Sequence, residues 1–392
     1  MKILYDHQIF EEQKFGGISR YFCELIRALG NLENVKVDVS LGYSKNEYLK
    51  TSIFSYKAKD DLSTFENFMP GRNFKGKWNL YMVCNKIRKP IDAGLVNKSL
   101  SIEALKNQDF DIFHPTYYDD YFLAYMGNKP FVLTVYDMIH EIYPEFFGLA
   151  DMVSARKRNL VKMAHKIFAI SECTKKDLIH FFGVPSEKIV VTHLATSMNS
   201  DLATHASLPF HCILPERYIL FVGARNIYKN FYFFINSMLA LMEVDPTLHI
   251  FCTGGIFNAN EKFFLEKNGI ADRVHQHAAS DTELEYLYQR ALAFVFPSLY
   301  EGFGIPVLEA FSNACPMVLA NAGSLPEIAG NAAVYFEPKN TQSVHAAMSE
   351  VLYNPARRTQ LVEFGKKRLK QFSWRKTCEE TETVYRDLMA GI

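Results

Sequence analysis

Short apolar runs alternate with longer amphipathic stretches along most of this chain. Such alternation is typical of a parallel β-sheet whose buried strands are connected by helices that cover its faces. A first series of apolar runs lies at residues 2–4, 35–41, 112–114, 131–135, 167–170 and 189–191. A second series lies at residues 218–222, 249–252, 274–277, 293–296, 317–319 and 333–335. The pattern predicts an α/β protein with two parallel sheets.

The length of the chain favours two domains, because 392 residues exceed what one hydrophobic core usually supports. A polar, proline-bearing stretch at 196–217 separates the two series and is the expected linker. We therefore expect an N-terminal Rossmann-like domain over residues 1–200 and a second over residues 201–373. A further helix is predicted within residues 374–392.

Composition narrows the classes of function. Forty-three basic and 43 acidic residues leave no net charge, which argues against a nucleic-acid partner. The seven cysteines include no Cys-x-x-Cys pair, so neither a zinc site nor a disulfide framework is indicated. The first residues turn polar too soon for a signal peptide, and no stretch reaches the roughly 18 apolar residues of a spanning helix. We expect a cytoplasmic protein whose membrane contact, if it has one, is peripheral.

Two carboxylates follow the apolar run at 293–296. Glu301 is predicted to lie in a strand-to-helix loop, and Glu309 about one turn into the helix that Pro306 begins. Gly302 and Gly304 would let the backbone approach a ligand, and N–H groups at a helix start attract phosphate or hydroxyl oxygens. Fixed carboxylates beside such donors suit a polyhydroxylated ligand. The alternative interpretation is that neither residue binds a ligand: Glu301 is a solvated surface residue, and Glu309 is favoured by the helix dipole near the helix start.

The sequence Tyr-Glu-Gly-Phe-Gly-Ile-Pro-Val-Leu-Glu-Ala at 300–310 closely resembles the donor-site signature of family-4 retaining glycosyltransferases. The stretches at 16–21, 222–231, 323–327, 330–333 and 372–374 resemble the same family. The resemblance implies the GT-B fold, in which two Rossmann-like parallel-sheet domains face each other across a cleft and the last helix packs back on the first domain. It also implies transfer of a hexose-type sugar, with retention at the anomeric carbon.

The same resemblance implies the substrates. The donor would be a nucleotide diphosphate sugar, with a GDP-mannose-like sugar favoured over a UDP-sugar. The acceptor would be a hydroxyl of a glycan or of a lipid-linked glycan, in bacterial surface-polysaccharide or lipopolysaccharide synthesis. Because the nucleotide sugar is a substrate, no cofactor is expected.

Roles in the donor site are carried over residue by residue. Glu301 would hold sugar hydroxyls and Glu309 the ribose hydroxyls, while Arg225 and Lys229 would stabilise the departing diphosphate. Many relatives carry adjacent Arg and Lys here, whereas this chain has Tyr228 before Lys229, so Arg225 must supply any guanidinium. The expected donor-binding residues are Gly16, Gly17, Gly223, Arg225, Lys229, Asn230, Glu301, Gly302, Phe303, Gly304, Ile305 and Glu309.

On the acceptor side, many relatives place a sugar-contacting His where this chain has Tyr136. The nearest polar replacements are Asp137 and His140. Asp137 would orient the sugar or the acceptor, and His140 would lie on the acceptor side. The expected catalytic residues are Glu301, Arg225, Lys229, Asp137 and His140. A His in a loop is also commonly a capping or surface residue. His114 fits either the acceptor cleft or the packed core.

No metal site is expected. Asp109 and Asp111 match the Asp-x-Asp pattern that binds metal in a different glycosyltransferase architecture, but they precede a strand here instead of following one. They are interpreted as polar residues at a strand start.

Residues 71–90 combine basic and aromatic side chains with no acidic residue. This combination suits an anionic bilayer surface or a lipid diphosphate acceptor, although a helix with a solvated basic face has the same composition.

Three other functions fit parts of the sequence. A nucleotide-sugar epimerase would bind the same donor without an acceptor, and a non-catalytic subunit of a glycan-synthesis complex would bind it without turnover. A dinucleotide oxidoreductase would need a Gly-x-Gly-x-x-Gly after the first strand, which the chain lacks.

Overall fold

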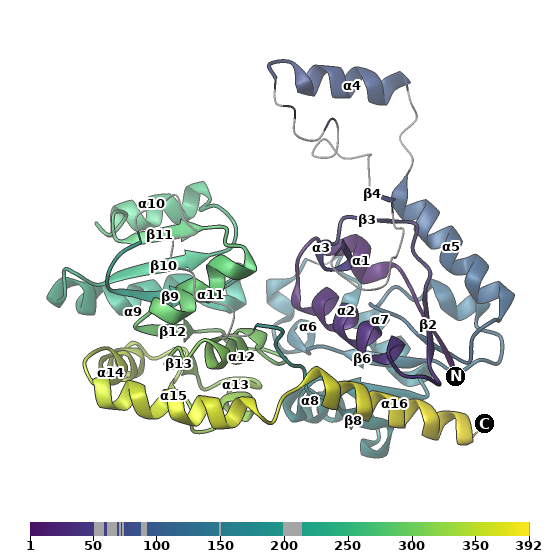
Figure 1. The fold of residues 1–392 in the computed structure, drawn as a ribbon. Helices are drawn as coiled ribbons and strands as arrows, with labels where there is room; N and C mark the ends of the chain where they lie inside the picture. The colour runs from purple at the N-terminus through teal and green to yellow at the C-terminus, as the bar shows by residue number, and fades with distance from the viewer. Residues whose placement is uncertain are drawn as a thin grey trace.

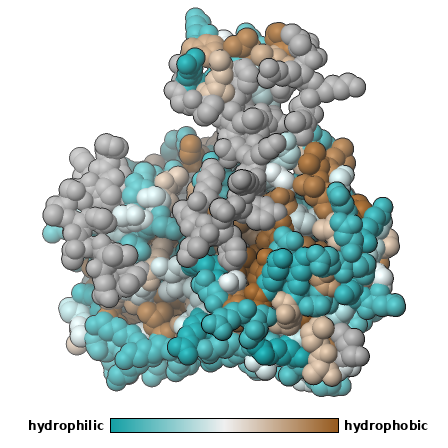
Figure 2. All heavy atoms as spheres, turned by 45° about the vertical axis from the view of Figure 1, so that its right-hand side comes forward, coloured by the Kyte–Doolittle hydropathy of each residue, from teal (hydrophilic) through white to brown (hydrophobic). Residues whose placement is uncertain are grey.

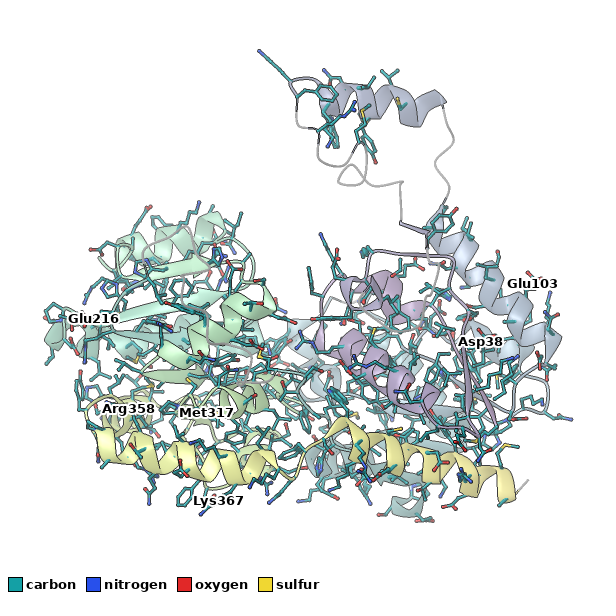
Figure 3. The ribbon with its side chains drawn as sticks, viewed as in Figure 1. Asp38, Glu103, Glu216, Met317, Arg358 and Lys367 are labelled. Atoms are coloured by element: carbon teal, nitrogen blue, oxygen red, sulfur yellow. The ribbon has the colours of Figure 1, made fainter. Side chains whose placement is uncertain are left out.

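The computed structural model describes residues 1–50, 59–60, 69, 72, 74–87, 92–148, 150–198 and 214–391. Within them the chain forms two units, each a parallel sheet covered by helices (Figure 1). Side chains fill both units, with Met317 inside the second and Lys367 on its outer surface (Figure 3). The predicted boundary at residue 200 and most of the expected linker lie outside the described residues.

The first unit contains the predicted strands. They are β1 (Lys2–Tyr5), β2 (Lys36–Val39), β5 (Ile112–His114), β6 (Val132–Val135), β7 (Lys166–Ala169) and β8 (Ile189–Val191). Strands β2, β1 and β5 pair in that order, as do β6, β7 and β8, and a parallel bridge from Phe113 to Phe131 joins the two groups. The apolar pattern does not predict the short pair β3 (Tyr43–Ser44) and β4 (Lys59–Asp60).

The second unit has a sheet in the order β11-β10-β9-β12-β13-β14. Its strands are β9 (Tyr218–Phe221), β10 (His249–Thr253), β11 (Val274–His277), β12 (Ala293–Phe296), β13 (Met317–Ala320) and β14 (Val334–Phe336). All neighbours are parallel. The strand order reverses between β9 and β12, and open sheets of this kind bind ligands outside the strand carboxyl ends at such a point. The loops after β9 and β12 carry Lys229 and Glu301, so both charges come to this point.

The helices follow the predicted alternation with the strands. In the first unit they are α1 (Gln8–Glu12), α2 (Gly17–Gly30), α3 (Glu47–Lys50), α4 (Lys77–Ile87), α5 (Ala93–Asn107), α6 (Ile139–Ile142), α7 (Val153–Met163) and α8 (Glu172–Phe182). In the second they are α9 (Phe231–Val244), α10 (Ala259–Lys267), α11 (Asp281–Arg290), α12 (Ile305–Ser312), α13 (Leu325–Ala329), α14 (Thr341–Leu352) and α15 (Pro355–Leu369). The final helix is α16 (Trp374–Ala390).

Helix α16 follows the second unit but packs on the first (Figure 1). The Tyr385 hydroxyl lies 2.9 Å from that of Tyr5 and 2.6 Å from Nδ1 of His114, whose Nε2 lies 2.8 Å from Oγ1 of Thr134. Burial lowers the pKa of His114 to about 3, so the ring is neutral. His114 is therefore a packed residue that ties β5 to α16, and it does not line an acceptor site.

Helix α4 projects away from the rest of the first unit (Figure 1). In Figure 2, apolar and polar side chains are mixed at the top of the molecule, where α4 lies. No described helix combines the length and apolarity needed to cross a bilayer.

Candidate functional site

The starts of α2 and α12 meet where the two units come together. A β-carbon added to Gly17 would lie 3.3 Å from Cδ1 of Ile305, so the Gly16–Gly17 turn faces the first residue of α12. Gly304 caps α12 with a φ of 95°, a conformation that favours glycine, and Pro306 fits the first turn. Because N–H groups at helix starts attract anions, the two helix starts provide donors from both domains.

Lys229 and Glu301 form an ion pair at the switch point of the second sheet. Nζ of Lys229 lies 2.6 Å from Oε1 of Glu301, and both side chains are mostly buried. Burial acts to lower the pKa of Lys229, but the charge and hydrogen bond of Glu301, together with Tyr228 and Asp137, raise it above its usual value. Lys229 ends the 3₁₀ turn η5 (Ile227–Lys229), and its Nζ lies 4.9 Å from the ring centre of Phe296. The predicted sugar-binding carboxylate and phosphate-binding ammonium are thus in direct contact.

Glu309 lies one turn inside α12, buried between the two units. Its Oε2 accepts a hydrogen bond from the hydroxyl of Tyr288 at 3.2 Å, and its Oε1 lies 3.4 Å from Nη1 of Arg20 in the first unit. Burial raises the pKa of Glu309, and the Arg20 charge and the Tyr288 hydrogen bond oppose this rise. A carboxylate held in this way is prepared to accept hydrogen bonds from hydroxyls.

Arg225 points toward α10 instead of toward Lys229. Its Nε lies 2.7 Å from Oε1 of Glu261, and its Nη2 donates a hydrogen bond to the carbonyl of Gly255 at 2.6 Å. Both side chains of this ion pair are buried. The remaining nitrogen, Nη1, is buried without a hydrogen-bond partner among the described residues. A diphosphate role for Arg225 stays a prediction.

Two other donor-site residues shape the loop after β9. Gly223 has a φ of 112°, which favours glycine, and Asn230 begins α9 with a φ of 58°. The Asn230 amide donates to the carbonyl of Pro338 at 2.7 Å, so this side chain fixes the loop to the segment after β14.

Gly302 is a point of close approach between the backbones of the two units. A β-carbon added to Gly302 would lie 1.8 Å from the carbonyl oxygen of Tyr136 and 3.0 Å from Cβ of Asp137. The sequence predicts that Gly302 makes room for a ligand. In the structure, the space beside Gly302 is instead occupied by the backbone of the first domain. Asp137 therefore lies beside the turn that carries Glu301, and its Oδ1 accepts a hydrogen bond from the Ile139 N–H at 3.1 Å.

His140 contacts two other residues of the first domain. Its ring stacks on Phe147 with centroids 3.8 Å apart, and its Nε2 lies 3.4 Å from Oδ2 of Asp151. Its Nδ1 is buried and has no partner among the described residues. The structure thus brings Asp137, Lys229 and Glu301 together, whereas the contacts of His140 are with Phe147 and Asp151. A role for His140 toward the acceptor stays a prediction.

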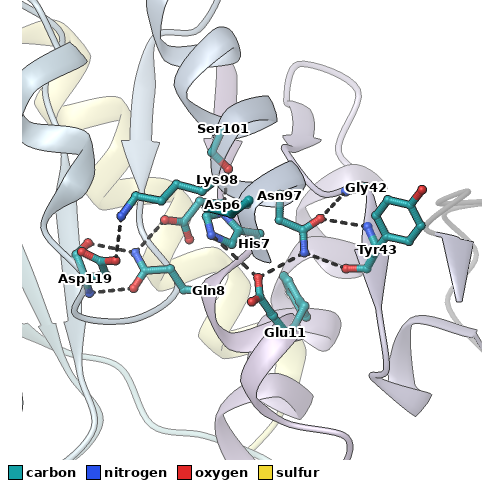
Figure 4. Close-up of polar contacts among 12 residues, drawn as sticks. Asp6, His7, Gln8, Glu11, Gly42, Tyr43, Asn97, Lys98, Ser101 and Asp119 are labelled. Atoms are coloured by element: carbon teal, nitrogen blue, oxygen red, sulfur yellow. Dashed lines mark hydrogen bonds and ion pairs between the residues drawn. The ribbon is translucent and has the colours of Figure 1, made fainter. Parts of the chain in front are cut away.

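A polar network occupies the switch point of the first sheet, after β1 and β5 (Figure 4). Asp6 is buried, and its carboxylate accepts from the Thr116 N–H at 2.8 Å and from the Gln8 amide at 2.7 Å. Gln8 also contacts Asp119, which pairs with Lys98 at 3.4 Å. These bonds fix the loops that face the second unit.

Asp109 and Asp111 both bind the first strand. Oδ2 of Asp109 lies 2.6 Å from Nζ of Lys2, and Asp111 accepts from the Lys2 N–H at 2.7 Å. In the described part of the chain, His, Cys, Asp and Glu residues form no group of three that could hold a metal ion.

Several contacts between the units involve residues that received no role from the sequence. The Tyr300 hydroxyl donates to Oδ2 of Asp177 at 2.6 Å. Arg20 pairs with Asp281 and Glu309, which come from the second unit. Arg20 was signalled only by its place in the stretch at 16–21, one turn after Gly16–Gly17. No local signal identified Asp281 as its partner.

Comparison with known proteins identifies both halves of the chain. Residues 15–197 match the model for Glycosyltransferase Family 4, and residues 213–368 match that for Glycosyl transferases group 1. O-antigen chain mannosyltransferase B of Escherichia coli is 29% identical over 271 residues, which cover 65% of this chain and 70% of that protein. O-antigen chain mannosyltransferase RfbU of Salmonella typhimurium is 27% identical over 244 residues, covering 58% and 67% respectively.

A solved structure extends the likeness to the whole fold. Anabaena Alr3699/HepE, in complex with UDP and glucose, superposes with a TM-score of 0.65 over 98% of both chains at 12% identity. The expected GT-B architecture is confirmed.

Proposed function

We propose that this chain, which belongs to the glycosyltransferases that join a family 4 domain to a group 1 domain, transfers a hexose-type sugar from a nucleotide diphosphate sugar to a hydroxyl acceptor. The observation that carries the proposal is the contact between Lys229 and Glu301 beside two helix starts that face each other from opposite domains. A cation, two carboxylates and backbone donors match a ligand with a diphosphate and several hydroxyls. A glycan or lipid-linked acceptor and a mannose-bearing donor are favoured by the two O-antigen mannosyltransferases to which the chain is similar.

Donor binding exchanges contacts that already exist in the protein. Lys229 turns from Glu301 to the diphosphate, and Glu301 accepts hydrogen bonds from sugar hydroxyls. The N–H groups at Gly16–Gly17 and at residues 302–305 bind phosphate oxygens, and Glu309 takes the ribose hydroxyls. The charge on the departing diphosphate is thereby stabilised by groups that are in place before the reaction.

Transfer proceeds with retention at the anomeric carbon. As the bond to the diphosphate breaks, the acceptor hydroxyl attacks from the same face, and a phosphate oxygen takes its proton. Asp137 lies beside the Glu301 turn and orients the sugar or the acceptor. A divalent ion has no necessary task, because Lys229 and the helix-start amides supply the positive charge. Transfer that disappears in excess EDTA and returns with Mg²⁺ would contradict this metal-independent form of the mechanism.

The proposed activity is tested by incubating the protein with GDP-mannose, UDP-glucose and UDP-galactose, with and without a lipid-linked glycan fraction, and measuring the free nucleotide. The proposal expects release of one nucleotide that depends on the acceptor. Sugar products formed without acceptor would identify an epimerase. Nucleotide-sugar binding without turnover would identify a non-catalytic subunit.

Helix α4 is proposed as a contact with an anionic membrane, where lipid-linked acceptors lie. Its side chains Trp78 and Val83 are 55% and 52% exposed, and the basic residues Arg72 and Lys75 precede it, also exposed. Exposed aromatic and basic side chains together favour an anionic bilayer surface. Arg88 and Lys89, which belong to the same stretch of the sequence, lie outside the described residues.

Vesicle sedimentation tests this contact. The double substitution Trp78→Ser with Val83→Ser should abolish sedimentation with phosphatidylglycerol vesicles, whereas Leu95→Ser should not. Leu95 is a matched control, because it is 65% exposed on α5 of the same domain. Equal sedimentation of the double variant and the wild type would refute the membrane role.

A further inference from the structure

We propose that Arg20 is a positioning residue that couples closure of the two domains to donor binding, by bridging Asp281 and Glu309 from the opposite domain. The proposal rests on the proposed function, because it takes Glu309 as the carboxylate that receives donor hydroxyls. The set of Arg20, Asp281 and Glu309 is called the Arg20 clamp below.

The Arg20 clamp joins one helix of the first domain to two helices of the second. Nη2 of Arg20 lies 2.6 Å from Oδ2 of Asp281, the first residue of α11, and Nη1 lies 3.4 Å from Oε1 of Glu309 in α12. Tyr48, from the first domain, supports the guanidinium with its hydroxyl at 3.2 Å and its ring centre at 4.7 Å. The Arg20 side chain is only 9% exposed and the Asp281 side chain is 64% exposed, so the guanidinium is buried while the Asp281 end of the contact meets solvent.

The two ion pairs of the clamp differ in length. The Asp281 contact has the length of a strong charge-assisted hydrogen bond, whereas the Glu309 contact is at the long limit. Glu309 is 8% exposed, and its other oxygen is already held by Tyr288. Each carboxylate oxygen can accept two hydrogen bonds, so a donor hydroxyl can join Arg20 at Oε1 or Tyr288 at Oε2. The geometry points to Asp281 as the anchor of Arg20 and to Glu309 as the contact that Arg20 shares with the donor.

The charge of Arg20 keeps Glu309 ready to accept hydrogen bonds. The groups that face Glu309 are Arg20 from α2 and Tyr288, Asp281 and Glu285 from α11. Burial raises the pKa of Glu309, and Arg20 is the largest influence that lowers it. If Arg20 is removed and Glu309 stays buried, nothing of comparable size opposes the effect of burial, and the carboxyl takes up a proton more readily. Since a protonated carboxyl accepts hydroxyl hydrogen bonds less well, protein without Arg20 binds the donor more weakly.

The test compares Arg20→Ala with Arg27→Ala, a matched control. Arg27 lies two turns further along α2 and pairs with Glu24 within the same domain. The probes are GDP and UDP, with affinity measured by titration calorimetry from pH 5 to pH 8. Small-angle X-ray scattering of the nucleotide-free proteins reports domain separation.

Arg20→Ala should weaken binding of the preferred nucleotide by about tenfold at pH 7. It should also shift the acidic loss of binding to higher pH and increase the radius of gyration, while Arg27→Ala matches the wild type. Asp281→Asn should also weaken nucleotide binding. Because the Asp281 side chain is 64% exposed, this substitution should not disturb folding, and it provides a second test if Arg20→Ala does not fold. An unchanged pH profile and radius of gyration in both variants would overturn the proposal.

Failure of the proposed function gives a different result. If wild-type protein binds neither nucleotide, the proposed function is wrong, and the scattering data alone decide whether Arg20 holds the domains together. If nucleotide binding is normal but neither variant alters it, the proposed function stands and the Arg20 clamp is refuted.

Discussion

Gly302→Ala should separate the two domains without unfolding either one. The added β-carbon would lie 1.8 Å from the carbonyl oxygen of Tyr136, and real β-carbons essentially never come closer than 3.0 Å to another atom. Relief therefore requires a movement of about 1.2 Å between two backbones.

Neither backbone yields easily. The turn at Gly302 is fixed by Ser324, whose hydroxyl lies 3.0 Å from the Glu301 carbonyl and 2.9 Å from the Phe303 carbonyl. Tyr136 is fixed by its own hydroxyl, which donates to the Thr116 carbonyl at 2.9 Å. Overpacking of this kind costs about 1–3 kcal/mol, which corresponds to a roughly 5- to 150-fold fall in the ratio of closed to open protein.

The assay is the rate of sugar transfer together with the radius of gyration and the thermal midpoint. Gly302→Ala should reduce transfer by at least about fivefold and increase the radius of gyration, with little change in the midpoint. Gly255→Ala is the control, because a β-carbon there meets nothing within 4 Å. Transfer and radius of gyration equal to those of the wild type in Gly302→Ala would refute the reasoning.

Three further predictions follow from the contacts. Glu301→Ala should lower the rate of transfer about 100-fold. Because the Glu301 and Lys229 side chains touch at 2.6 Å, the double variant with Lys229→Ala should lose less activation free energy than the two single variants added together. A rate of Glu301→Ala within threefold of wild type, or full additivity in the double variant, would argue against the site. Arg225→Ala should lower the free energy of unfolding by about 3–5 kcal/mol in urea titrations, because it leaves Glu261 buried and unpaired, and Glu261→Gln in that background should restore part of the loss. Between pH 6.5 and pH 4, His114 should cost wild-type protein on the order of 3 kcal/mol of its free energy of unfolding, and His114→Gln should not show this loss. In this pH range the histidine of the unfolded chain takes up a proton, whereas the buried ring, with a pKa of about 3, does not. Identical acid profiles of the two proteins would contradict the His114 prediction.

Patterns local in sequence predicted most of the fold. Apolar runs located the strands of both large sheets, and Gly304 with Pro306 located the start of α12, because these features depend on near neighbours along the chain. The pair β3 and β4 was missed, since two-residue strands produce no recognisable apolar run. The family resemblance placed Lys229 in the loop after β9 and Glu301 in the loop after β12. The strand order explains why the two side chains meet.

Contacts between the domains could not be predicted in the same way. Arg20 lies 261 residues from Asp281 and 289 from Glu309, so no spacing in the sequence connects them. The predicted reason for Gly302 was a ligand, whereas the nearest atom belongs to Tyr136. Residue type alone likewise does not show that Arg225 turns to Glu261, because a guanidinium binds carboxylate and phosphate with the same geometry.

Proton NMR of the transfer reaction tests the central proposal most directly. The protein is given the α-linked nucleotide sugar that the donor panel identifies, with its acceptor, and the anomeric signals are followed beside the free nucleoside diphosphate. The proposal predicts an α-linked product that grows in step with the nucleotide and is absent with Glu301→Ala. A β-linked product, or nucleotide release at the wild-type rate by Glu301→Ala, would contradict it.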